Sequence, residues 1–261
     1  MLSGNALMIL DPHHRFVGDL AGGIAIDVTE EGKTYADQLV PFAHAVGDPY
    51  KAFNGTVFRL PLRTAKQAQE SKIKNSPTSV SEIRELLYSF GSNDLEELVL
   101  FLRHITSVEI RHIDSNGKEK LIGRVKLIDS SPSADGIRTR TTLWEKSDGK
   151  VQERRWAIRQ LHHNRSEANK ILLKRLGYDV AEALTADKLT PTIELAIPLD
   201  NKPIRGSLYT LLPLPVKTGF PLHLNAVFAL TPDRQSLKNI EESGTKESRE
   251  RLVGLLSLFQ V

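Results

Sequence analysis

The sequence predicts an α+β fold, in which helices mix with mainly antiparallel strands. Apolar residues recur at helical spacing after Ser79-Val-Ser-Glu82, which has the form of a capping box. Apolar and polar residues instead alternate on both sides of Ser115-Asn116-Gly117, the composition of a tight hairpin turn. A further strand pair is expected over residues 137–147 and 150–161, which flank Ser147-Asp148-Gly149.

The first 63 residues favour short strands and turns. Residues 6–12, ALMILDP, predict a buried strand that ends at Asp11-Pro12, and residues 33–46 predict short helical turns around Pro41. In residues 53–63, FNGTVFRLPLR, a Gly55-Thr56 pair precedes an alternating strand. Gly55 permits a backbone turn that other residues resist, and Thr56 adds a hydroxyl that can donate and accept. The pair is therefore either an ordinary strand start or a ligand-facing position.

Residues 64–78 form a hydrophilic connector without apolar periodicity, and we take them as the boundary between segments 1–63 and 79–261. The helix after Ser79 is expected to stop at Gly91, and a second, core helix is expected from Asn93 or Asp94 through His104. Further on, the sequence predicts a helix that ends at Gly177, strands over 192–199, 207–215 and 220–230, and a last helix over 246–259.

The composition excludes several classes of protein. The chain has 261 residues, a net charge of +3 and no cysteine, so disulfides and thiolate metal sites are absent. No apolar run approaches the ~20 residues that span a bilayer. We expect a soluble protein of the cytoplasm. The pairs His13-His14 and His162-His163 point to opposite faces of a strand, which disfavours chelation of a metal, and no metal site is predicted.

The usual nucleotide and hydrolase motifs are missing. None of the 17 glycines lies two residues from another, so there is no G-x-G fingerprint, and there is no P-loop, G-x-S-x-G or H-E-x-x-H. Basic residues cluster near Arg138, Arg154 and Lys170, but acidic residues interleave and few aromatic residues accompany them. A coherent basic face with stacking residues would be needed for nucleic acid. Nucleic acid is therefore an unlikely ligand, and a nucleic-acid-binding module stays an alternative of a different class.

Four segments together resemble the sacsin/Nov-type repeat family. They are LSGNALMILDPHHRFVG, FNGTVFRLPLR, LLYSFGSNDLEELVLFLRHITSVEI and FPLHLNAVFALTPDRQSL, in this order along residues 2–237. The family has an ATPase domain of the GHKL class, shared with gyrase, the ninety-kilodalton heat-shock chaperone and histidine kinases. The resemblance implies a partial GHKL ATPase sheet over residues 1–63 and a mixed α/β middle-type domain over 79–261, with 64–78 as linker.

The resemblance also implies roles for three residues. Gly55 and Thr56 match the Gly-Thr of the family's nucleotide pocket, where the hydroxyl helps to hold adenine. Arg234, in Thr231-Pro-Asp-Arg234, matches loosely the middle-domain arginine that reaches the γ-phosphate, and a guanidinium suits phosphate oxygens. The alternatives are a plain strand start and a surface arginine after a turn.

The chain departs from the family in the residues of ATP hydrolysis. No asparagine has a glutamate four residues before it, so the E-x-x-x-N helix that supplies the general base and the magnesium ligand is absent. The adenine-reading D-x-G-x-G loop is absent as well. In the family these motifs precede the ILDPH strand, so the chain is expected to contain only the back half of an ATPase domain, with an unpaired sheet edge and an uncovered apolar face.

The resulting hypothesis is a fragment or truncated member of a sacsin-like chaperone ATPase family, which acts through protein clients or chaperone partners. No ATPase activity, and no or weak binding of ATP and Mg²⁺, is expected for this chain alone. Association through the exposed edge of the N-terminal sheet is expected, and a membrane partner is not. The alternatives are a complete ATP-binding chaperone-type ATPase whose N-terminal segment is missing from this sequence, and an unrelated enzyme whose site the sequence does not reveal.

Overall fold

The computed structural model describes residues 1–11, 22–71, 75–132, 136–162 and 192–226, together with 228, 230, 231, 233, 236 and 237. The chain divides into two compact units, Met1–Val80 (unit 1) and Ser81–Val261 (unit 2). Each unit is described by itself. The predicted helices that end at Gly177 and over 246–259, and the residues His13, His14, His163 and Arg234, lie outside the described residues.

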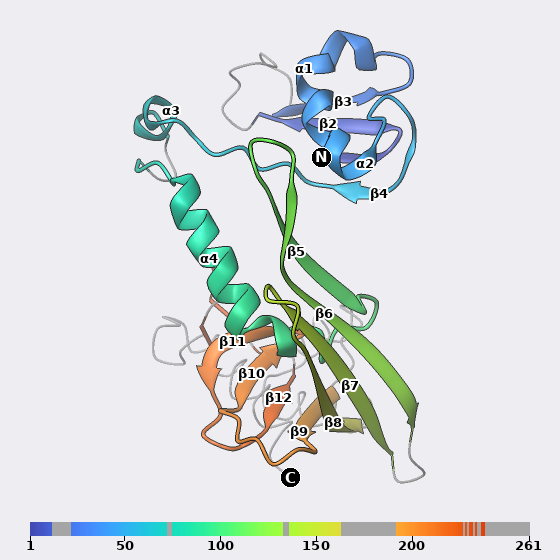
Figure 1. The fold of residues 1–261 in the computed structure, drawn as a ribbon, viewed down its shortest axis with the longest axis vertical. Coiled ribbons are helices and arrows are strands. Elements are labelled where there is room, and N and C mark those ends of the chain that lie inside the picture. Colours follow the sequence, from blue (N-terminus) through green and yellow to red (C-terminus); the bar gives the residue numbers. More distant parts are fainter. Residues whose placement is uncertain are drawn as a thin grey trace, which may run out of the picture. The chain divides into compact units, whose positions relative to one another are not determined.

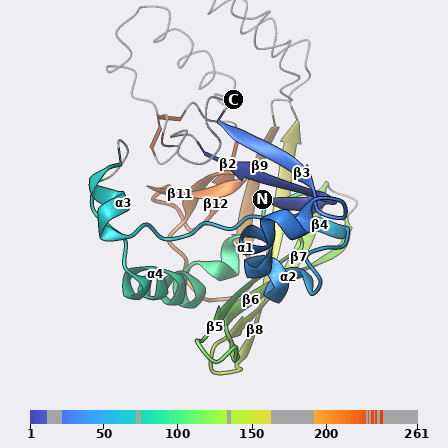
Figure 2. The ribbon, with the colours of Figure 1, turned by 90° about the horizontal axis from the view of Figure 1, so that it is seen from above.

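Unit 1 is a small antiparallel sheet covered on one face by short helices (Figures 1 and 2). Its strand order is β3-β2-β1-β4, with β1 at Leu2–Gly4, β2 at Ala6–Leu10, β3 at Gly23–Asp27 and β4 at Phe53–Val57. The predicted helical turns around Pro41 are confirmed as η1 (Gly32–Tyr35), α1 (Ala36–Leu39), η2 (Val40–Phe42) and α2 (Ala43–Val46). Leu39 and Phe42 pack against Leu2, Leu7 and Ile26 to form the core of this unit.

The prediction of a strand over residues 57–63 is wrong, because the strand lies at Phe53–Val57. β4 ends at Val57 because its partner β1 offers only three residues for pairing, and residues 58–64 have no regular structure. The Gly55-Thr56 pair therefore lies inside the strand rather than before it. The connector also contains a short helix, α3 (Ala65–Gln69), which Thr64 caps through a reciprocal capping box with Gln67.

Unit 2 is an eight-stranded mixed sheet with the order β11-β10-β12-β9-β8-β7-β6-β5. Only β10 and β12 run parallel; the other neighbours are antiparallel. The predicted hairpins are confirmed, since β5 and β6 flank the Gly117 turn and β7 and β8 flank the Gly149 turn. The strands are β5 (Ser107–Ile113), β6 (Glu119–Pro132), β7 (Ile137–Lys146), β8 (Val151–His162), β9 (Thr192–Pro198), β10 (Ser207–Thr210), β11 (Leu212–Lys217) and β12 (His223–Asn225).

Two predicted strands are shorter than expected. The segment over 207–215 is a hairpin, β10 and β11, because Leu211 adopts a left-handed conformation (φ 69°) and turns the chain. Asn225 holds this turn, since its Oδ1 accepts a hydrogen bond from the Leu211 N–H at 2.7 Å. Among the described residues of the strand expected over 220–230, β12 is the regular part, and it lies between β10 and β9.

The helix α4 (Val80–Asn93) continues through Gly91, where a stop was expected. A Cβ at this position would lie 2.9 Å from Ile122 Cγ2, and the Gly91 carbonyl accepts a hydrogen bond from Trp144 Nε1 at 3.1 Å. Gly91 is therefore a close-approach residue between helix and sheet, not a terminator. The expected core helix after Asn93 is only one 3-10 turn, η3 (Leu95–Glu97), although Leu95, Val99 and Leu100 are fully buried as predicted.

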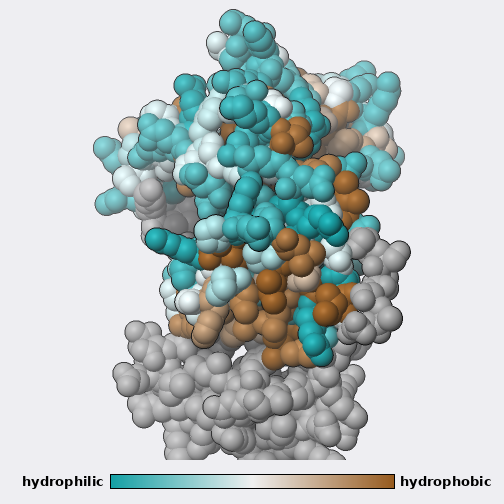
Figure 3. All heavy atoms as spheres, turned by 60° about the horizontal axis from the view of Figure 1, so that its bottom comes forward, coloured by the Kyte–Doolittle hydropathy of each residue, from teal (hydrophilic) through white to brown (hydrophobic). Residues whose placement is uncertain are grey.

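These observations confirm the α+β class, as a small antiparallel sheet and a larger mixed sheet with few helices. The assignment of the two sheets to an ATPase part and a middle-type domain stays a prediction. None of the helices that the structure describes combines the length and the apolar character needed to cross a membrane. The face drawn in Figure 3 is largely hydrophilic, with hydrophobic side chains gathered in one part of it.

Candidate functional site

The predicted nucleotide-contacting residue Thr56 lies on the face of the unit 1 sheet that is turned away from the helices. Ser3 and Thr56 are register partners in β1 and β4, and their hydroxyl oxygens lie 2.8 Å apart. Leu2 and Val57, the next pair, contribute to the core on the opposite face. Thr56 is exposed, so its hydroxyl is accessible to a ligand. Gly55 beside it is also exposed.

The face that carries Ser3 and Thr56 is partly apolar. Met8 is 37% exposed and Leu10 is 72% exposed. Their partners in β3 cover little of this face, because Ala25 carries only a methyl group and Gly23 has no side chain. Among the described residues of unit 1 the helices pack on the other face, so Met8 and Leu10 stay exposed on this one.

The most apolar exposed segment of unit 1 follows β4 directly. Phe58 is 67% exposed, Leu60 is 86% exposed and Leu62 is 42% exposed. Arg59 and Pro61, which alternate with them, are exposed as well. We call residues 58–62 the apolar segment. Three large apolar side chains are thus exposed within five residues, outside any strand, and such a concentration often marks an interaction site.

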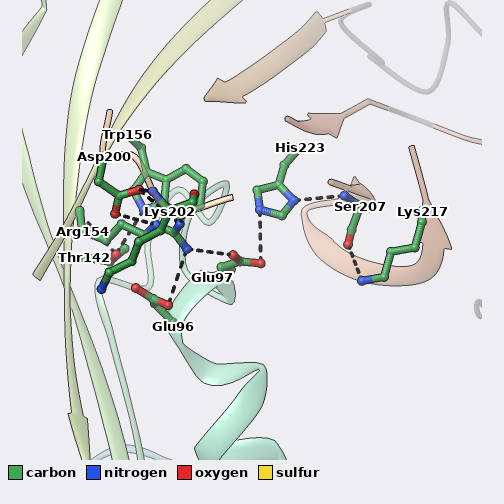
Figure 4. A network of polar contacts seen from close by, with 10 residues as sticks. All are labelled: Glu96, Glu97, Thr142, Arg154, Trp156, Asp200, Lys202, Ser207, Lys217 and His223. Atoms are coloured by element: carbon green, nitrogen blue, oxygen red, sulfur yellow. Dashed lines mark hydrogen bonds and ion pairs between the residues drawn. The ribbon is translucent and has the colours of Figure 1, made fainter. Parts of the chain in front are cut away.

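A partly buried ionic network joins η3, β8 and the turn after β9 in unit 2 (Figure 4). Its centre is Arg154 on β8, whose side chain is only 8% exposed. The guanidinium faces Asp200, with Nε 3.0 Å from Oδ2 and Nη2 3.2 Å from Oδ1, and Nη2 also donates to the Lys202 carbonyl at 3.0 Å. It lies over the Trp156 ring, with 4.9 Å from Cζ to the ring centroid.

Two glutamates of η3 complete this network. Glu96 Oε2 and Glu97 Oε1 lie 3.8 and 3.6 Å from Arg154 Nη1. One guanidinium thus faces three carboxylates, and Lys202 supplies a second cation nearby. The network ties η3 and β8 to the turn after β9, which are far apart in the sequence.

The network extends from Glu97 to His223 of β12, which is fully buried. His223 Nδ1 accepts a hydrogen bond from the Ser207 backbone N–H at 3.1 Å. With Nδ1 as an acceptor, the ring carries its proton on Nε2, which lies 3.1 Å from Glu97 Oε2 without the geometry of an aligned hydrogen bond. The ring packs between Trp156 and Tyr209, with centroids 5.3 and 5.2 Å away.

The folded structure shifts the pKa values of two carboxylates of this network, Glu96 and Asp200, in opposite directions. Burial raises the pKa of Glu96, and the Arg154 charge, at a longer distance, offsets this only in part. For Asp200, burial acts to raise the pKa, but the hydrogen bonds from Arg154 and the Lys202 amide, with the charges of both residues, lower it below the usual value. Arg154 is thus matched mainly by Asp200, and Glu96 is the poorly compensated charge.

This imbalance predicts the effect of Glu96→Gln. Because the folded-state pKa of Glu96 is raised, the folded chain holds this proton more tightly than the unfolded chain, and ionisation of Glu96 opposes folding. Glu96→Gln is therefore expected to increase the free energy of unfolding at pH 7 by roughly 1 kcal/mol or less. This gain in the free energy of unfolding should shrink as the pH falls through the pKa of Glu96 in the folded chain towards its pKa in the unfolded chain. Urea unfolding between pH 4 and 8 measures it; a constant or negative difference contradicts it.

A second ionic bridge stabilises the same half of the sheet. Glu194 of β9 is 3% exposed, and its Oε1 lies 2.6 Å from Arg138 Nη2. Its Oε2 accepts from Asn225 Nδ2 at 2.7 Å. Since Asn225 also holds the Leu211 turn, this bridge connects β7, β9 and β12 to the β10–β11 hairpin.

The residue types of a Ser-His-carboxylate triad meet here, but their geometry does not fit that reaction. The Ser207 hydroxyl accepts from Lys217 Nζ at 2.9 Å, while His223 Nδ1 is occupied by the Ser207 backbone N–H. Neither nitrogen of His223 is therefore placed to take the hydroxyl proton. Among the described residues no group of three or more His, Cys, Asp or Glu side chains could hold a metal ion. We interpret the network as a structural joint of unit 2.

Local sequence patterns do not indicate this network as a whole. In the sequence Arg154 stands only among clustered basic residues with acidic residues interleaved, a pattern typical of a solvated surface. The one usable signal is the alternation in β8, where Arg154 shares a strand face with the buried Trp156 and Ile158. The network and the Ser3–Thr56 pair lie in different units, and Arg234 lies outside the described residues.

Residues 1–123 match the model of the sacsin domain family. The match includes unit 1 and continues through β5 into β6. Human sacsin is 25% identical to the chain over 287 residues, which cover 91% of this chain. The chain spans 6% of the length of human sacsin. Both findings support a distant similarity to sacsin over most of the chain, in agreement with the resemblance found in the sequence, and leave the ATPase and middle-type assignments as predictions.

Proposed function

We propose that the chain binds extended, apolar segments of non-native protein clients or chaperone partners, as a module similar to those of the sacsin-like, chaperone-type ATPase family. The observation that carries this proposal is the apolar segment. Phe58, Leu60 and Leu62 are the largest apolar groups that unit 1 exposes together. The similarity to human sacsin and the sacsin domain match over residues 1–123 support the family context.

Burial of the apolar segment against a client would supply the driving force. Complete burial of a Phe or Leu side chain contributes roughly 1.5–3 kcal/mol. Most of the surface of Leu60 and Phe58 is free, so a client residue that covers them gains most of this amount. Arg59 lies between them and is exposed, which favours a client segment with acidic residues next to its apolar ones.

Substitution of the apolar segment tests this function. We expect the full chain to bind fluorescein-labelled carboxymethylated α-lactalbumin, a permanently unfolded protein, in fluorescence anisotropy titrations. The triple variant Phe58→Ser, Leu60→Ser, Leu62→Ser should raise the Kd at least about tenfold, since one buried apolar side chain alone accounts for that factor.

A matched control removes three exposed apolar groups of unit 2. Leu86 is 63% exposed, Val151 is 60% exposed and Leu199 is 51% exposed. The triple Ser variant at these positions should keep the wild-type Kd within about threefold. Equal binding by both triple variants, or no binding by the wild-type chain, overturns the proposal.

ATP and Mg²⁺ are proposed as ligands of the complete family member, with no or weak binding by this chain alone. The absent E-x-x-x-N and G-x-G motifs support this. Titration calorimetry with millimolar Mg-ATP is therefore expected to give no saturable heat. Saturable binding that Thr56→Val abolishes would instead support the ATP-binding alternative and place Gly55 and Thr56 in its pocket, because valine keeps the shape of threonine but removes the hydroxyl.

A further inference from the structure

The two edge strands of the unit 2 sheet differ in how readily a further strand could pair with them. At one edge, β11 contains Pro213 and Pro215, which have no N–H to offer another strand. At the other edge, β5 contains neither proline nor lysine, the residues that usually block an edge. Among the described residues β5 pairs with β6 alone. The bulge in this pair lies on β6 at Ile122, so β5 itself is a regular strand.

The hydrogen bonds at the two ends of β5 show which of its residues face outwards. The Thr106 carbonyl accepts from Leu127 N at 2.7 Å, and the Asp114 N–H donates to the Lys118 carbonyl at 3.0 Å. Even-numbered residues therefore bond to β6 at both ends. Because the direction of backbone groups alternates along a strand, the N–H and C=O groups of Ser107, Glu109, Arg111 and Ile113 point to the open edge.

The side chains of β5 make this edge complementary to itself. A second antiparallel copy whose centre is Ile110 places Glu109 opposite Arg111 of the other copy, and Arg111 opposite Glu109. It also aligns odd residues with odd residues, so the outward backbone groups of both strands meet. A centre at Glu109 or Arg111 satisfies the backbone equally but places like charges opposite each other, which is unfavourable.

In this register, the core-facing side of the junction between the two copies is apolar at its centre. Val108 and Ile110 are half-buried and pack against the cluster of Leu95, Val99, Val125, Leu127 and Trp144. With Ile110 at the centre, it meets Ile110 of the other copy, and the two clusters become continuous across the junction. On the outer face Glu109 and Arg111 already contact Arg124 and Glu119, so the new pairs extend an existing ladder of charges.

We propose that β5 is a self-association edge, at which two copies of this chain pair antiparallel about Ile110 and join their sheets. The partner is a second copy rather than another protein because the charge pattern of Ser107–Ile113 is its own complement. One strand pair is a small contact compared with stable interfaces. The dimer should therefore form in the micromolar to millimolar range.

Sedimentation equilibrium of the full chain tests this pairing. The wild type should show a monomer–dimer equilibrium. Glu109→Arg and Arg111→Glu should each raise the dissociation constant about tenfold or more, because each replaces two attractive pairs by two repulsive pairs. The double variant E109R/R111E restores opposite charges across the junction and should return the constant to within about threefold of the wild type.

A second measurement needs no variant. In hydrogen exchange of the wild type, the amides of Glu109 and Arg111 should gain protection as the protein concentration rises. The amides of Val108 and Ile110, already bonded within the monomer, should not change. A chain that stays monomeric at millimolar concentration, a dimer that neither single charge reversal weakens, or concentration-dependent protection elsewhere but not at Glu109 and Arg111 overturns the proposal.

Discussion

Replacement of Arg154 by methionine is expected to lower the free energy of unfolding of unit 2 by about 3–5 kcal/mol, the usual cost of removing one partner from a buried ion pair. Methionine fills much of the same volume, so the loss arises from charge rather than from a cavity. Without the guanidinium, the carboxylates of Asp200, Glu97 and Glu96 would face one another with little compensation. The Lys202 carbonyl would also lose its donor.

Urea unfolding followed by tryptophan fluorescence measures this loss in unit 2 selectively. The two tryptophans of the chain, Trp144 and Trp156, are both buried in that unit. The matched control is Arg124→Met, since Arg124 also faces more than one carboxylate, those of Glu145 and Glu109, but is 44% exposed. That variant should lose far less than Arg154→Met, because water screens an exposed ion pair. Similar losses in both variants would show that the buried network does not stabilise unit 2 beyond an ordinary surface pair.

The pH dependence gives an independent check on Arg154→Met. Carboxylates that lose their cation are harder to ionise in the folded chain than in the unfolded chain. As the pH falls, the folded variant therefore takes up protons before the unfolded variant does. Its loss of unfolding free energy relative to the wild type should become smaller between pH 7 and pH 4. A deficit that is independent of pH would point to lost packing on Trp156 instead of uncompensated charge.

Elements whose structure is decided by neighbours in the sequence could be predicted from the sequence. The hairpins at Gly117 and Gly149 follow from turn residues between alternating strands, and both glycines have positive φ angles. The start of α4 follows from the residues around Ser79, and the turns near Pro41 follow from proline in the first turn of a short helix. None of these depends on a residue far along the chain.

Elements decided by a distant partner could not be predicted. Gly91 looks like a helix terminator until Ile122 and Trp144 are placed against it. The alternation of residues 57–63 is that of a strand, but β1 is too short to pair with it. The network of Arg154, Asp200, Glu97 and His223 depends on the order of strands in the sheet, which brings β8, β9 and β12 together. No local pattern in a single sequence encodes that order.

Gly206→Ala is expected to destabilise unit 2 by about 3 kcal/mol, at the upper end of the cost of overpacking, because backbone atoms occupy the space of the new methyl group. A Cβ at this position would overlap the carbonyl oxygens of Phe220 and Leu222 and the Thr218 hydroxyl. The two carbonyl oxygens belong to the backbone and cannot rotate away as a side chain would. The Gly206 N–H donates to the Phe220 carbonyl at 3.1 Å, and the Thr218 N–H donates to the Gly206 carbonyl at 2.9 Å.

The Thr218 hydroxyl holds the same loop in place through the Phe220 and Leu222 carbonyls, each at 3.1 Å. Any shift that admits a methyl group must therefore break several of these bonds together. It would also displace Ser207, whose N–H bonds to His223, and so reach the ionic network through Glu97. The substitution of one hydrogen by one methyl group is thus expected to act on the whole junction of β10, β12 and η3.

Gly149→Ala separates this steric effect from the ordinary cost of losing a glycine. Gly149 has a φ of 78° in the β7–β8 turn, but a Cβ there would meet nothing within 4 Å. Its replacement should cost about 1–2 kcal/mol, the penalty of a left-handed conformation in a residue with a side chain. Gly206 has no such conformation, so its larger cost must come from contact. If urea unfolding finds Gly206→Ala no more destabilised than Gly149→Ala, the loop of residues 218–222 does not enclose Gly206 as the structure describes.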